Sequence, residues 1–390
     1  MTNRVPNPEL QVGPDNKQWW NRAENRRFGF HNAHILFRRA HMVRARHVLP
    51  LSPAPDATLA ALPAVADLTG HPAFSALVCA RGTDILYERT APDFGPDRVH
   101  SIQSISKMHL HLIVGRLLQR GLIDLSRPVG SYLPEIGPGY AAAPVQALLD
   151  MNVTNAFCED YSDPLSDCYT EEIALGWRLP DGDAPEPTMR DFARGIAATG
   201  PGGLSSENVY KTDKPGVPVQ YKSANSDVLT LICARLCPTD LRAEIEAIAD
   251  AAGYSGAFHI SLDAEGLPAF SGGGCLSPRD LARFGLLFHR ISGGDTFGNP
   301  EFLARAPLRD APRFDPPREF MYYSNHLMTD GRFVGHGGYG GQFLMVDLAT
   351  GLVCAFLSVL DNDAGYDTGY MTRVILALKS ICHAAPSHPA

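Results

Sequence analysis

The pattern of apolar and polar residues predicts strands near both ends of the chain. Residues 73–79 and 83–88 are short strand-like runs separated by a Gly-containing turn, and together they predict a β-hairpin. A second β-region is expected toward the other end, in residues 342–347 and 352–358, again with a Gly-containing turn between them. We expect an amphipathic closing helix to follow from about 367 to 382.

The middle of the chain carries helical and loop signals instead. Residues 108–114 form a strongly apolar run that is typical of a buried helix. Farther along, Ser277 has the features of an N-cap, with Pro278 at the first helical position and Asp280 three residues after the cap. Residues 155–218 are rich in Pro, Gly, Asp and Glu, and we expect them to form long loops around a site.

These elements predict an α+β fold. We expect an antiparallel sheet built from the N- and C-terminal segments and flanked by helices, with a helix-rich domain inserted between them. The predicted discontinuous α/β domain comprises residues 17–103 and 255–383, and the helix-rich domain comprises residues 104–254. Residues 1–16 and 384–390 are predicted to be flexible ends. A cleft where the two domains meet is the expected active site.

Composition narrows the classes of partner. The chain has 390 residues, 45% of them hydrophobic, which is enough for a large core. A net charge of −8 argues against nucleic acid and against an anionic membrane surface, since such partners require clustered Lys and Arg. The start of the chain lacks an apolar leader, and we find no run of about 18 apolar residues. We therefore expect a cytoplasmic protein with a small-molecule substrate, and leave a homodimer open.

Cysteine and histidine spacing argues against a metal site. The chain has eight Cys residues, none of them in a C-x-x-C pair, and most lie in apolar runs, which favours buried, reduced thiols. His109 and His111 are two apart on a predicted helix and so point to different sides, which makes them a poor metal pair. We expect neither a metal nor an organic cofactor.

The most specific chemical pattern in the chain is Ser104-x-x-Lys107. Both side chains lie on one face if a helix starts at the Ser, and no other Lys has a Ser three positions upstream. Free backbone N–H groups at the start of a helix favour negative charge developing on the hydroxyl. An apolar wall disfavours the ammonium form of Lys107 and frees its amine to act as a base. The simpler alternative is a surface Ser and Lys at ordinary helical spacing.

Two further stretches could complete a site for acyl transfer, which also needs a proton relay and an oxyanion hole. Tyr221 precedes an apolar helix and can exchange protons with a Lys, although an ordinary half-buried Tyr is the simpler interpretation. Residues 335–341, with five Gly, open a strand and allow close backbone approach. They match G-x-G-x-x-G, but a dinucleotide motif must follow a strand and open a helix. The absence of G-x-S-x-G argues against an α/β-hydrolase.

The motif order points to a known superfamily. Ser104-x-x-Lys107, then Tyr221-x-Ser223, then His336-Gly337-Gly338 before a β-hairpin resembles the serine β-lactamases and penicillin-binding proteins, in their class C and esterase-like branch. Within that branch the chain is most similar to the 6-aminohexanoate-dimer hydrolases, also called nylon-oligomer hydrolases. This closer likeness is carried by residues 159–167, 174–178, 221–227, 272–275 and 279–283. The resemblance implies a β-lactamase/transpeptidase-like fold.

The resemblance also implies roles for individual residues. Ser104 would be the nucleophile, Lys107 its general base and Tyr221 the general acid, with the backbone N–H groups of Ser104 and Tyr339 as the oxyanion hole. The substrate-binding residues that it implies are Tyr161, Glu172, Ser223, His336 and Gly338. Tyr161 would contact the leaving amide nitrogen, and Glu172 would hold a free amino group of the substrate.

Simpler alternatives exist for two of these residues. Tyr161 could be a loop Tyr packed beside Pro164, and Glu172 a solvated Glu near a helix start. Two departures from the family pattern also bear on the substrate. His336-Gly337-Gly338 replaces Lys-Thr-Gly, so the Lys that commonly meets a β-lactam carboxylate is absent and strong β-lactamase activity is not expected. Gly340 stands where the nylon-oligomer hydrolases have a His before the Gly-Gln that enters the strand, so the substrate can differ.

The sequence therefore predicts a serine hydrolase that forms an acyl-enzyme on Ser104. The expected substrate is a linear carboxylic amide of the 6-aminohexanoate-oligomer type, or an ester. Acidic residues between Glu159 and Glu172 add the hypothesis that the substrate carries an amine. The main alternative is a family VIII-type carboxylesterase or an acyltransferase. A weak β-lactamase and a non-catalytic binding protein with the penicillin-recognition fold rank lower.

Overall fold

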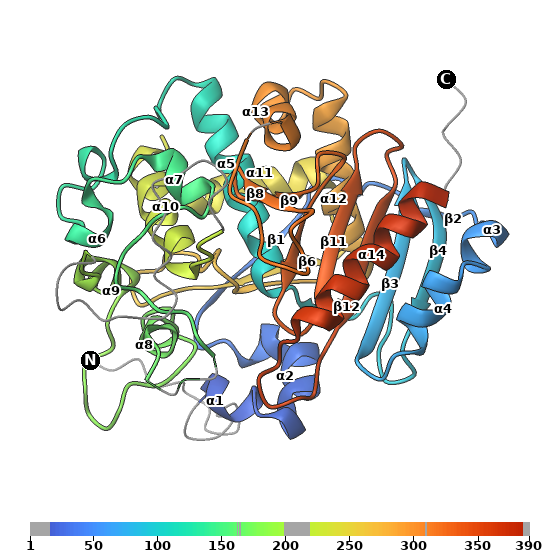
Figure 1. Cartoon of the computed structure of the whole chain (residues 1–390), viewed down its shortest axis with the longest axis horizontal. Coiled ribbons are helices and arrows are strands. Elements are labelled where there is room, and N and C mark those ends of the chain that lie inside the picture. The colour runs from blue at the N-terminus through green and yellow to red at the C-terminus, as the bar shows by residue number, and fades with distance from the viewer. Residues whose placement is uncertain (1–15, 162, 164, 199–218, 309, 385–390) are drawn as a thin grey trace.

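A large antiparallel sheet joins the two ends of the chain, as predicted. The computed structural model describes residues 16–161, 163, 165–198, 219–308 and 310–384. The sheet has eight strands, in the order β2 (Ser52–Pro53), β4 (Asp84–Thr90), β3 (Phe74–Arg81), β12 (Val353–Ser358), β11 (Gln342–Asp347), β10 (Phe333–Gly338), β9 (Leu327–Thr329) and β8 (Tyr322–Ser324). Neighbouring strands are antiparallel except for β2 and β4. Cys79 lies opposite Cys354 where the N-terminal and C-terminal hairpins meet, which confirms the predicted sheet (Figure 1).

Helices cover both faces of this sheet. α12 (Pro278–Ser292) packs on one face against β3, β11 and β12, while α4 (Pro63–Gly70) and α14 (Thr368–Ala384) pack on the other. α12 lies so close that a Cβ on Gly285 would come within 2.4 Å of Val353 Cγ1. The helix begins as predicted, with the Ser277 hydroxyl accepting a hydrogen bond from Asp280 N at 3.2 Å. Strands β3, β11 and β12 are therefore buried on both sides, which explains their nearly continuous apolar sequences.

A second, smaller sheet was not predicted. Its strands are β1 (Ala40–Arg44), β6 (Ala257–Ser261), β7 (Gly274–Leu276) and β5 (His100–Ser101), paired antiparallel in that order. β5 and β7 are too short to show an alternating pattern, so the sequence carried no strand signal there. The chain leaves β5 directly into the segment with Ser104, and Ile102 N donates to Gly274 O at 2.9 Å. This sheet therefore anchors the start of the candidate site.

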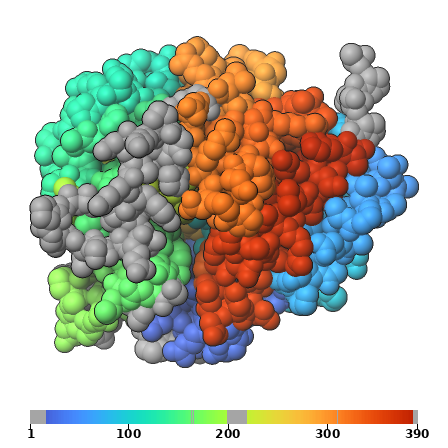
Figure 2. All heavy atoms as spheres, in the orientation of Figure 1, coloured from blue at the N-terminus to red at the C-terminus, as the bar shows by residue number. Residues whose placement is uncertain are grey.

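Between Ser104 and Tyr254 the described part of the chain contains helices and no strand. The helical elements of this region, starting one residue earlier with a 3₁₀ turn, are η2 (Gln103–Lys107), α5 (Met108–Gln119), η3 (Val129–Ser131), α6 (Pro138–Ala141), α7 (Val145–Leu149), α8 (Asp167–Ala174), α9 (Met189–Gly195), α10 (Ser223–Leu236) and α11 (Leu241–Ala252). One buried core continues from this region into the large sheet, and the division into two domains stays a prediction. In the space-filling view, the green middle segments meet the orange and red C-terminal segments (Figure 2).

The predicted loop region around the site is partly helical. Helices α8 and α9 interrupt residues 155–218, of which residues 162, 164 and 199–218 lie outside the described residues. In the two predicted flexible ends, residues 1–15 and 385–390 also lie outside the described residues. Asn16 begins α1 and Ala384 ends α14, so these two residues belong to helices, and the flexible ends stay a prediction. In the part of the chain that is described, no helix has the length and apolar character needed to cross a membrane.

The remaining elements lie at the start of the chain and beside the large sheet. They are α1 (Asn16–Trp20), α2 (Ala23–Leu36), α3 (Ala57–Ala60), α13 (Pro300–Arg305) and η4 (Ala306–Leu308). α1 and α2 lie together at one end of the large sheet, below β12 and α14 in the view of Figure 1. α2 also packs against β5, which places these first helices next to the segment that carries Ser104.

Candidate active site

Ser104 lies on a tight turn that leads into a buried helix. The turn is the 3₁₀ helix η2, which continues directly into α5, so the helical spacing expected of Ser104 and Lys107 is present. Gln103, just before the Ser, has φ +48, which is uncommon for a residue with a side chain. The turn is held by Ser106, whose hydroxyl donates to Gln103 O at 2.6 Å and accepts from Gly274 N at 2.9 Å. A strained backbone fixed in this way is typical of functional sites.

Lys107 is fully buried and its amine faces Ser104. Its Nζ donates to Ser104 Oγ at 3.0 Å, to Ser223 Oγ at 3.1 Å and to the backbone oxygen of Ser271. Burial lowers the pKa of Lys107 to about 8, although negative charge on Glu159 and other carboxyl groups opposes this shift. A substantial fraction of the amine is therefore neutral slightly above neutral pH, and a neutral amine at this distance can take a proton from the Ser104 hydroxyl.

Tyr221 lies on the other side of Ser104. The Lys107 amine is 5.1 Å from the centre of the Tyr221 ring, and the Tyr221 side chain hydrogen-bonds that of Ser104. Burial, followed by the charge of Glu159, raises the pKa of Tyr221 well above its usual value. The phenol therefore keeps its proton at neutral pH, so it can donate that proton to an atom bound at Ser104.

Ser104 and Tyr221 open into a cavity of about 460 Å³. Five of the residues predicted for the site line it: Ser104, Tyr161, Tyr221, Gly338 and Tyr339. Its other lining residues are Glu159, Asp160, Val219, Phe314, Asp315, Arg318, Met328, Gly337, Ala364, Tyr366 and Met371. Aromatic and Met side chains dominate this wall, with charged groups between them. A small organic molecule fits a cavity of this size and character.

The end of strand β10 approaches Ser104 closely. A Cβ on Gly338 would lie 2.8 Å from Ile102 O and 3.2 Å from Gln103 Cβ, so only glycine fits without displacing the turn. Gly340 and Gly341 follow with φ +90 and +92, and they reverse the chain into β11. Tyr339, between these glycines, lines the same cavity as Ser104. A backbone N–H beside a nucleophile can stabilise an oxyanion.

Glu159 organises the polar edge of the cavity, and sequence reasoning did not assign it a role of its own. Its Oε1 accepts hydrogen bonds from Ser223 Oγ at 2.8 Å and from the Tyr161 hydroxyl at 2.9 Å, and its Oε2 accepts from Ser223 N. Ser223 itself joins Glu159 to Lys107 and does not line the cavity. No local pattern distinguishes Glu159 from the other carboxylates of its segment.

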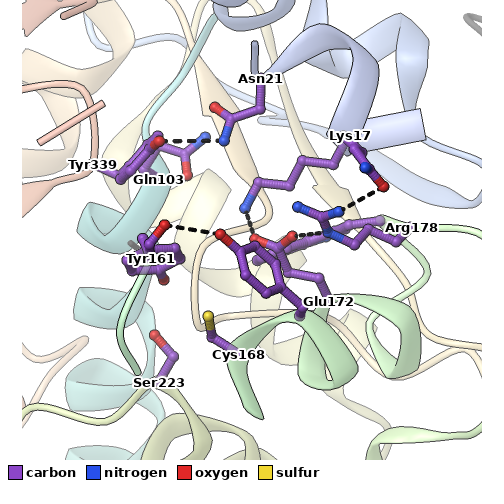
Figure 3. A network of polar contacts seen from close by, with 12 residues as sticks. Lys17, Asn21, Gln103, Tyr161, Cys168, Glu172, Arg178, Ser223 and Tyr339 are labelled. Carbon is purple, nitrogen blue, oxygen red and sulfur yellow. Dashed lines mark hydrogen bonds and ion pairs between the residues drawn. The ribbon is translucent and has the colours of Figure 1, made fainter. Parts of the chain in front are cut away.

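Besides Ser223, two further predicted substrate-binding residues are not brought to the cavity. Glu172 is 3% exposed, with Lys17 Nζ on one carboxylate oxygen and Arg178 Nε on the other at 2.5 Å (Figure 3). It is therefore neither open to a substrate amine nor the solvated Glu of the simpler alternative. His336 is fully buried, and both of its ring nitrogens are used within the fold: Nδ1 donates to Gly337 O at 2.6 Å and Nε2 accepts from the Tyr323 hydroxyl at 2.9 Å. Burial, and then the charge of Lys107, lower its pKa to about 3.

Tyr161 is held from several sides. Besides its bond to Glu159, its ring lies 5.4 Å from that of Tyr339, and its backbone oxygen accepts from the Tyr169 hydroxyl at 2.8 Å. Pro164, the neighbour in the simpler interpretation, lies outside the described residues. Tyr161 therefore faces the cavity as part of an aromatic wall.

A pair of carboxyl groups lies behind Lys107 and was missed from the sequence. Glu171 and Asp227 are both buried, and they lie close enough to affect each other's pKa. Burial raises the pKa of both carboxyl groups. The charge of Asp227 adds to the rise at Glu171, whereas contacts with Glu171 and Ser271 oppose the rise at Asp227. Negative charge on either group favours the ammonium form of Lys107.

The described residues contain no group of three or more His, Cys, Asp or Glu that could hold a metal ion. His109 is stacked between Phe258 and Phe284, with ring centres 4.5 and 4.3 Å away, and His111 is stacked on Phe302 at 4.7 Å. Both histidines are thus core residues. None of the eight cysteines forms a disulfide in the described structure, and all but Cys158 are buried, which agrees with the predicted buried, reduced thiols.

Comparisons with known proteins show the family of the chain. Residues 64–378 match the family described as Beta-lactamase. The 6-aminohexanoate-dimer hydrolase of Paenarthrobacter ureafaciens is 31% identical over 301 residues, which cover 74% of this chain and 70% of that protein.

Solved structures share the fold at lower identity. A putative 6-aminohexanoate-dimer hydrolase from Bacillus anthracis has a TM-score of 0.78 and 18% identity, covering 97% of this chain and 98% of the other. EstCE1, described as a hydrolase with promiscuous acyltransferase activity, has a TM-score of 0.57 and 15% identity, covering 82% of this chain and 97% of the other. At such identities the likeness concerns the fold alone.

Proposed function

Because the chain belongs to the Beta-lactamase family, we propose that it is a serine hydrolase that cleaves a carboxylic amide or ester through an acyl-enzyme on Ser104. In this proposal Lys107 is the general base and Tyr221 the general acid. The backbone N–H groups of Ser104 and Tyr339 bind the oxyanion. No cofactor takes part.

The proposed reaction has two halves. Neutral Lys107 takes the Ser104 proton while Oγ attacks the substrate carbonyl carbon, and the carbonyl oxygen becomes an oxyanion. As the tetrahedral intermediate collapses, the bond to the leaving nitrogen or oxygen breaks, and Tyr221 protonates that atom and is reprotonated from Lys107. A water molecule then attacks the acyl carbon and gives one proton to Lys107. The bond between the acyl carbon and Ser104 Oγ breaks, Lys107 returns that proton to Oγ, and the carboxylic acid leaves.

One observation carries this proposal: the amine of a fully buried Lys107 lies 3.0 Å from Ser104 Oγ. Burying a charged Lys costs free energy, and a hydrogen bond to a hydroxyl or a backbone oxygen offsets less of that cost than an ion pair does. A non-catalytic binding protein has no use for such a base. The geometry therefore favours catalysis over binding alone.

The proposed substrate is a linear amide of the 6-aminohexanoate-oligomer type. This choice follows from the relative at 31% identity, which is named 6-aminohexanoate-dimer hydrolase. The finer hypothesis of a substrate amine held by Glu172 loses its support, since Lys17 and Arg178 occupy that carboxylate. An ester substrate is the second candidate, because the aromatic and Met-rich cavity wall is equally suited to an aryl or alkyl ester.

Fluorophosphonate labelling followed by peptide mass spectrometry tests the proposal. We expect one adduct per chain, located on Ser104, and none in Ser104→Ala. Ser131→Ala is the matched control, because Ser131 is exposed and its hydroxyl donates to Pro128 O within its own turn. Labelling that persists undiminished in Ser104→Ala, or that fails in the folded wild-type protein, defeats the proposal.

A substrate panel separates the candidate activities. It should contain short p-nitrophenyl esters, linear ω-amino amides and nitrocefin, each assayed with and without an added alcohol or amine acceptor. Release of the free acid in the presence of acceptor identifies a hydrolase, while conversion to a new ester or amide identifies an acyltransferase. We expect little nitrocefin turnover, since Lys-Thr-Gly is replaced by His336-Gly337-Gly338.

A further inference from the structure

The first helices of the chain contact the turn that carries Tyr339, although they precede the segment matched by the family. We call residues 16–36, comprising α1 and α2, the N-terminal arm. Asn21 Nδ2 donates to the Tyr339 hydroxyl at 3.2 Å. Phe30, from α2, has its ring 6.1 Å from that of Tyr339, and a Cβ on Gly340 would lie 2.6 Å from its Cε1. The arm thus touches two successive residues of the turn.

Arg26 of the arm holds the segment behind Tyr339. It is 1% exposed, and its guanidinium donates to the backbone oxygens of Leu360, Asn362 and Asp363 at 2.8, 2.6 and 3.1 Å. The same segment continues to Gly365, whose oxygen accepts from Gly340 N at 3.0 Å. A Cβ on Gly365 would lie 2.1 Å from the Tyr339 hydroxyl, so the segment and the side chain are in close contact.

Lys17 ties the arm to the opposite side of the site. Its buried amine pairs with Glu172 on α8 and lies 4.6 Å from the ring centre of Trp177 (Figure 3). Its backbone N–H donates to Trp177 O at 2.9 Å. The amine also lies 6.0 Å from the ring centre of Tyr339. The arm therefore connects the α8 side of the cavity with the β10 side.

We propose that the N-terminal arm is a positioning element for the oxyanion hole, holding the backbone of Tyr339 in register with Ser104. This inference rests on the proposed function. Tyr339 lies between Gly338 and Gly340, and a glycine on either side leaves its backbone free to move unless the side chain is fixed. An oxyanion hole is effective only when its donors are already in place, so a small displacement lowers the rate. Asn21, Phe30 and Arg26 supply the fixing contacts and act through Tyr339.

Asn21→Ala tests the proposal most directly. We expect kcat for an activated ester to fall about five- to tenfold, the usual weight of one hydrogen bond, with little change in KM. Affinity for a boronic acid, whose tetrahedral adduct on Ser104 mimics the oxyanion, should fall in parallel. Asn21→Asp should recover much of kcat and of the boronic acid affinity, because its carboxylate can accept a hydrogen bond from the Tyr339 hydroxyl. Asn32→Ala is the matched control, since Asn32 Nδ2 only donates to Phe28 O on the same helix.

A double-mutant cycle shows whether Asn21 acts through Tyr339. In the Tyr339→Phe background the hydroxyl is absent, so adding Asn21→Ala should cause no further loss of boronate affinity. A full loss in that background would overturn the proposal. So would an Asn21→Ala variant that lowers the melting temperature but leaves kcat and boronate affinity unchanged, because the arm would then be scaffold only. Failure of the proposed function would give a different result. The wild-type protein would then bind no boronic acid, and fluorophosphonate would not label Ser104.

Discussion

The pH dependence of the reaction follows from the burial of Lys107. Only the neutral amine can act as the base, and the pKa of Lys107 is lowered to about 8. We therefore expect kcat/KM to rise with pH along an acid limb centred near 8, with the amine about one-tenth neutral at pH 7 and about nine-tenths neutral at pH 9. His336 does not contribute to this limb, because its pKa is about 3.

Glu159→Gln should move this limb toward lower pH. The Glu159 carboxylate favours the ammonium form of Lys107, so removing its charge makes the neutral amine available at lower pH. Glu159 Oε1 and Lys107 Nζ lie 2.8 and 3.1 Å from the same Ser223 Oγ. They are thus within about 6 Å of each other, where two unit charges at an effective dielectric constant near 20 interact by about 3 kcal/mol, or about two pKa units. Allowing for solvent screening, we expect a shift of about one to two units.

The assay is kcat/KM between pH 5 and 10 with an activated ester, normalised to the concentration of sites that label with fluorophosphonate. Asp163→Asn is the matched control, since Asp163 is an exposed carboxylate of the same segment. It should leave the limb in place. An acid limb that stays fixed in Glu159→Gln, or that moves to higher pH, would refute the assignment of Lys107 as the base.

Three further variants probe the site. Tyr221→Phe should lower kcat for an amide by about a hundredfold or more. The loss should be smaller for a p-nitrophenyl ester, because its leaving group needs no general acid, so the assay compares the two substrates. Gly338→Ala should slow fluorophosphonate labelling, because its Cβ would lie 2.8 Å from Ile102 O and displace the turn. Glu172→Gln leaves buried Lys17 without its counter-charge, so denaturant unfolding should show a loss of about 3–5 kcal/mol, while a KM effect specific to amino-bearing substrates would contradict this account.

The parts of the site that could be predicted from the sequence are local. Ser104 and Lys107 are three residues apart on one helical turn, so their spacing alone places them together. The hairpin of β3 and β4 likewise pairs neighbours in the chain. The family resemblance then added Tyr221 and Tyr339. In the structure Ser104, Tyr221 and Tyr339 line one cavity, and the buried Lys107 contacts Ser104.

What could not be predicted depends on distant contacts. Lys17 and Glu172 are 155 positions apart, and no periodicity shows that a Lys from the start of the chain occupies that carboxylate. The resemblance implied that His336 binds substrate, yet β10 is buried along its whole length and the His336 ring bonds to Tyr323. Glu171 and Asp227 come from different helices, so their proximity has no signal in either segment.

The central claim is that Ser104 receives the acyl group, and trapping the acyl-enzyme tests it most directly. Protein quenched in acid during turnover of p-nitrophenyl acetate should gain the mass of one acetyl group, and peptide mapping should place that group on Ser104. Ser104→Ala should gain none under the same conditions. Turnover by the wild-type protein with acetyl found only on another residue, or an equal gain of mass in Ser104→Ala, would contradict the account.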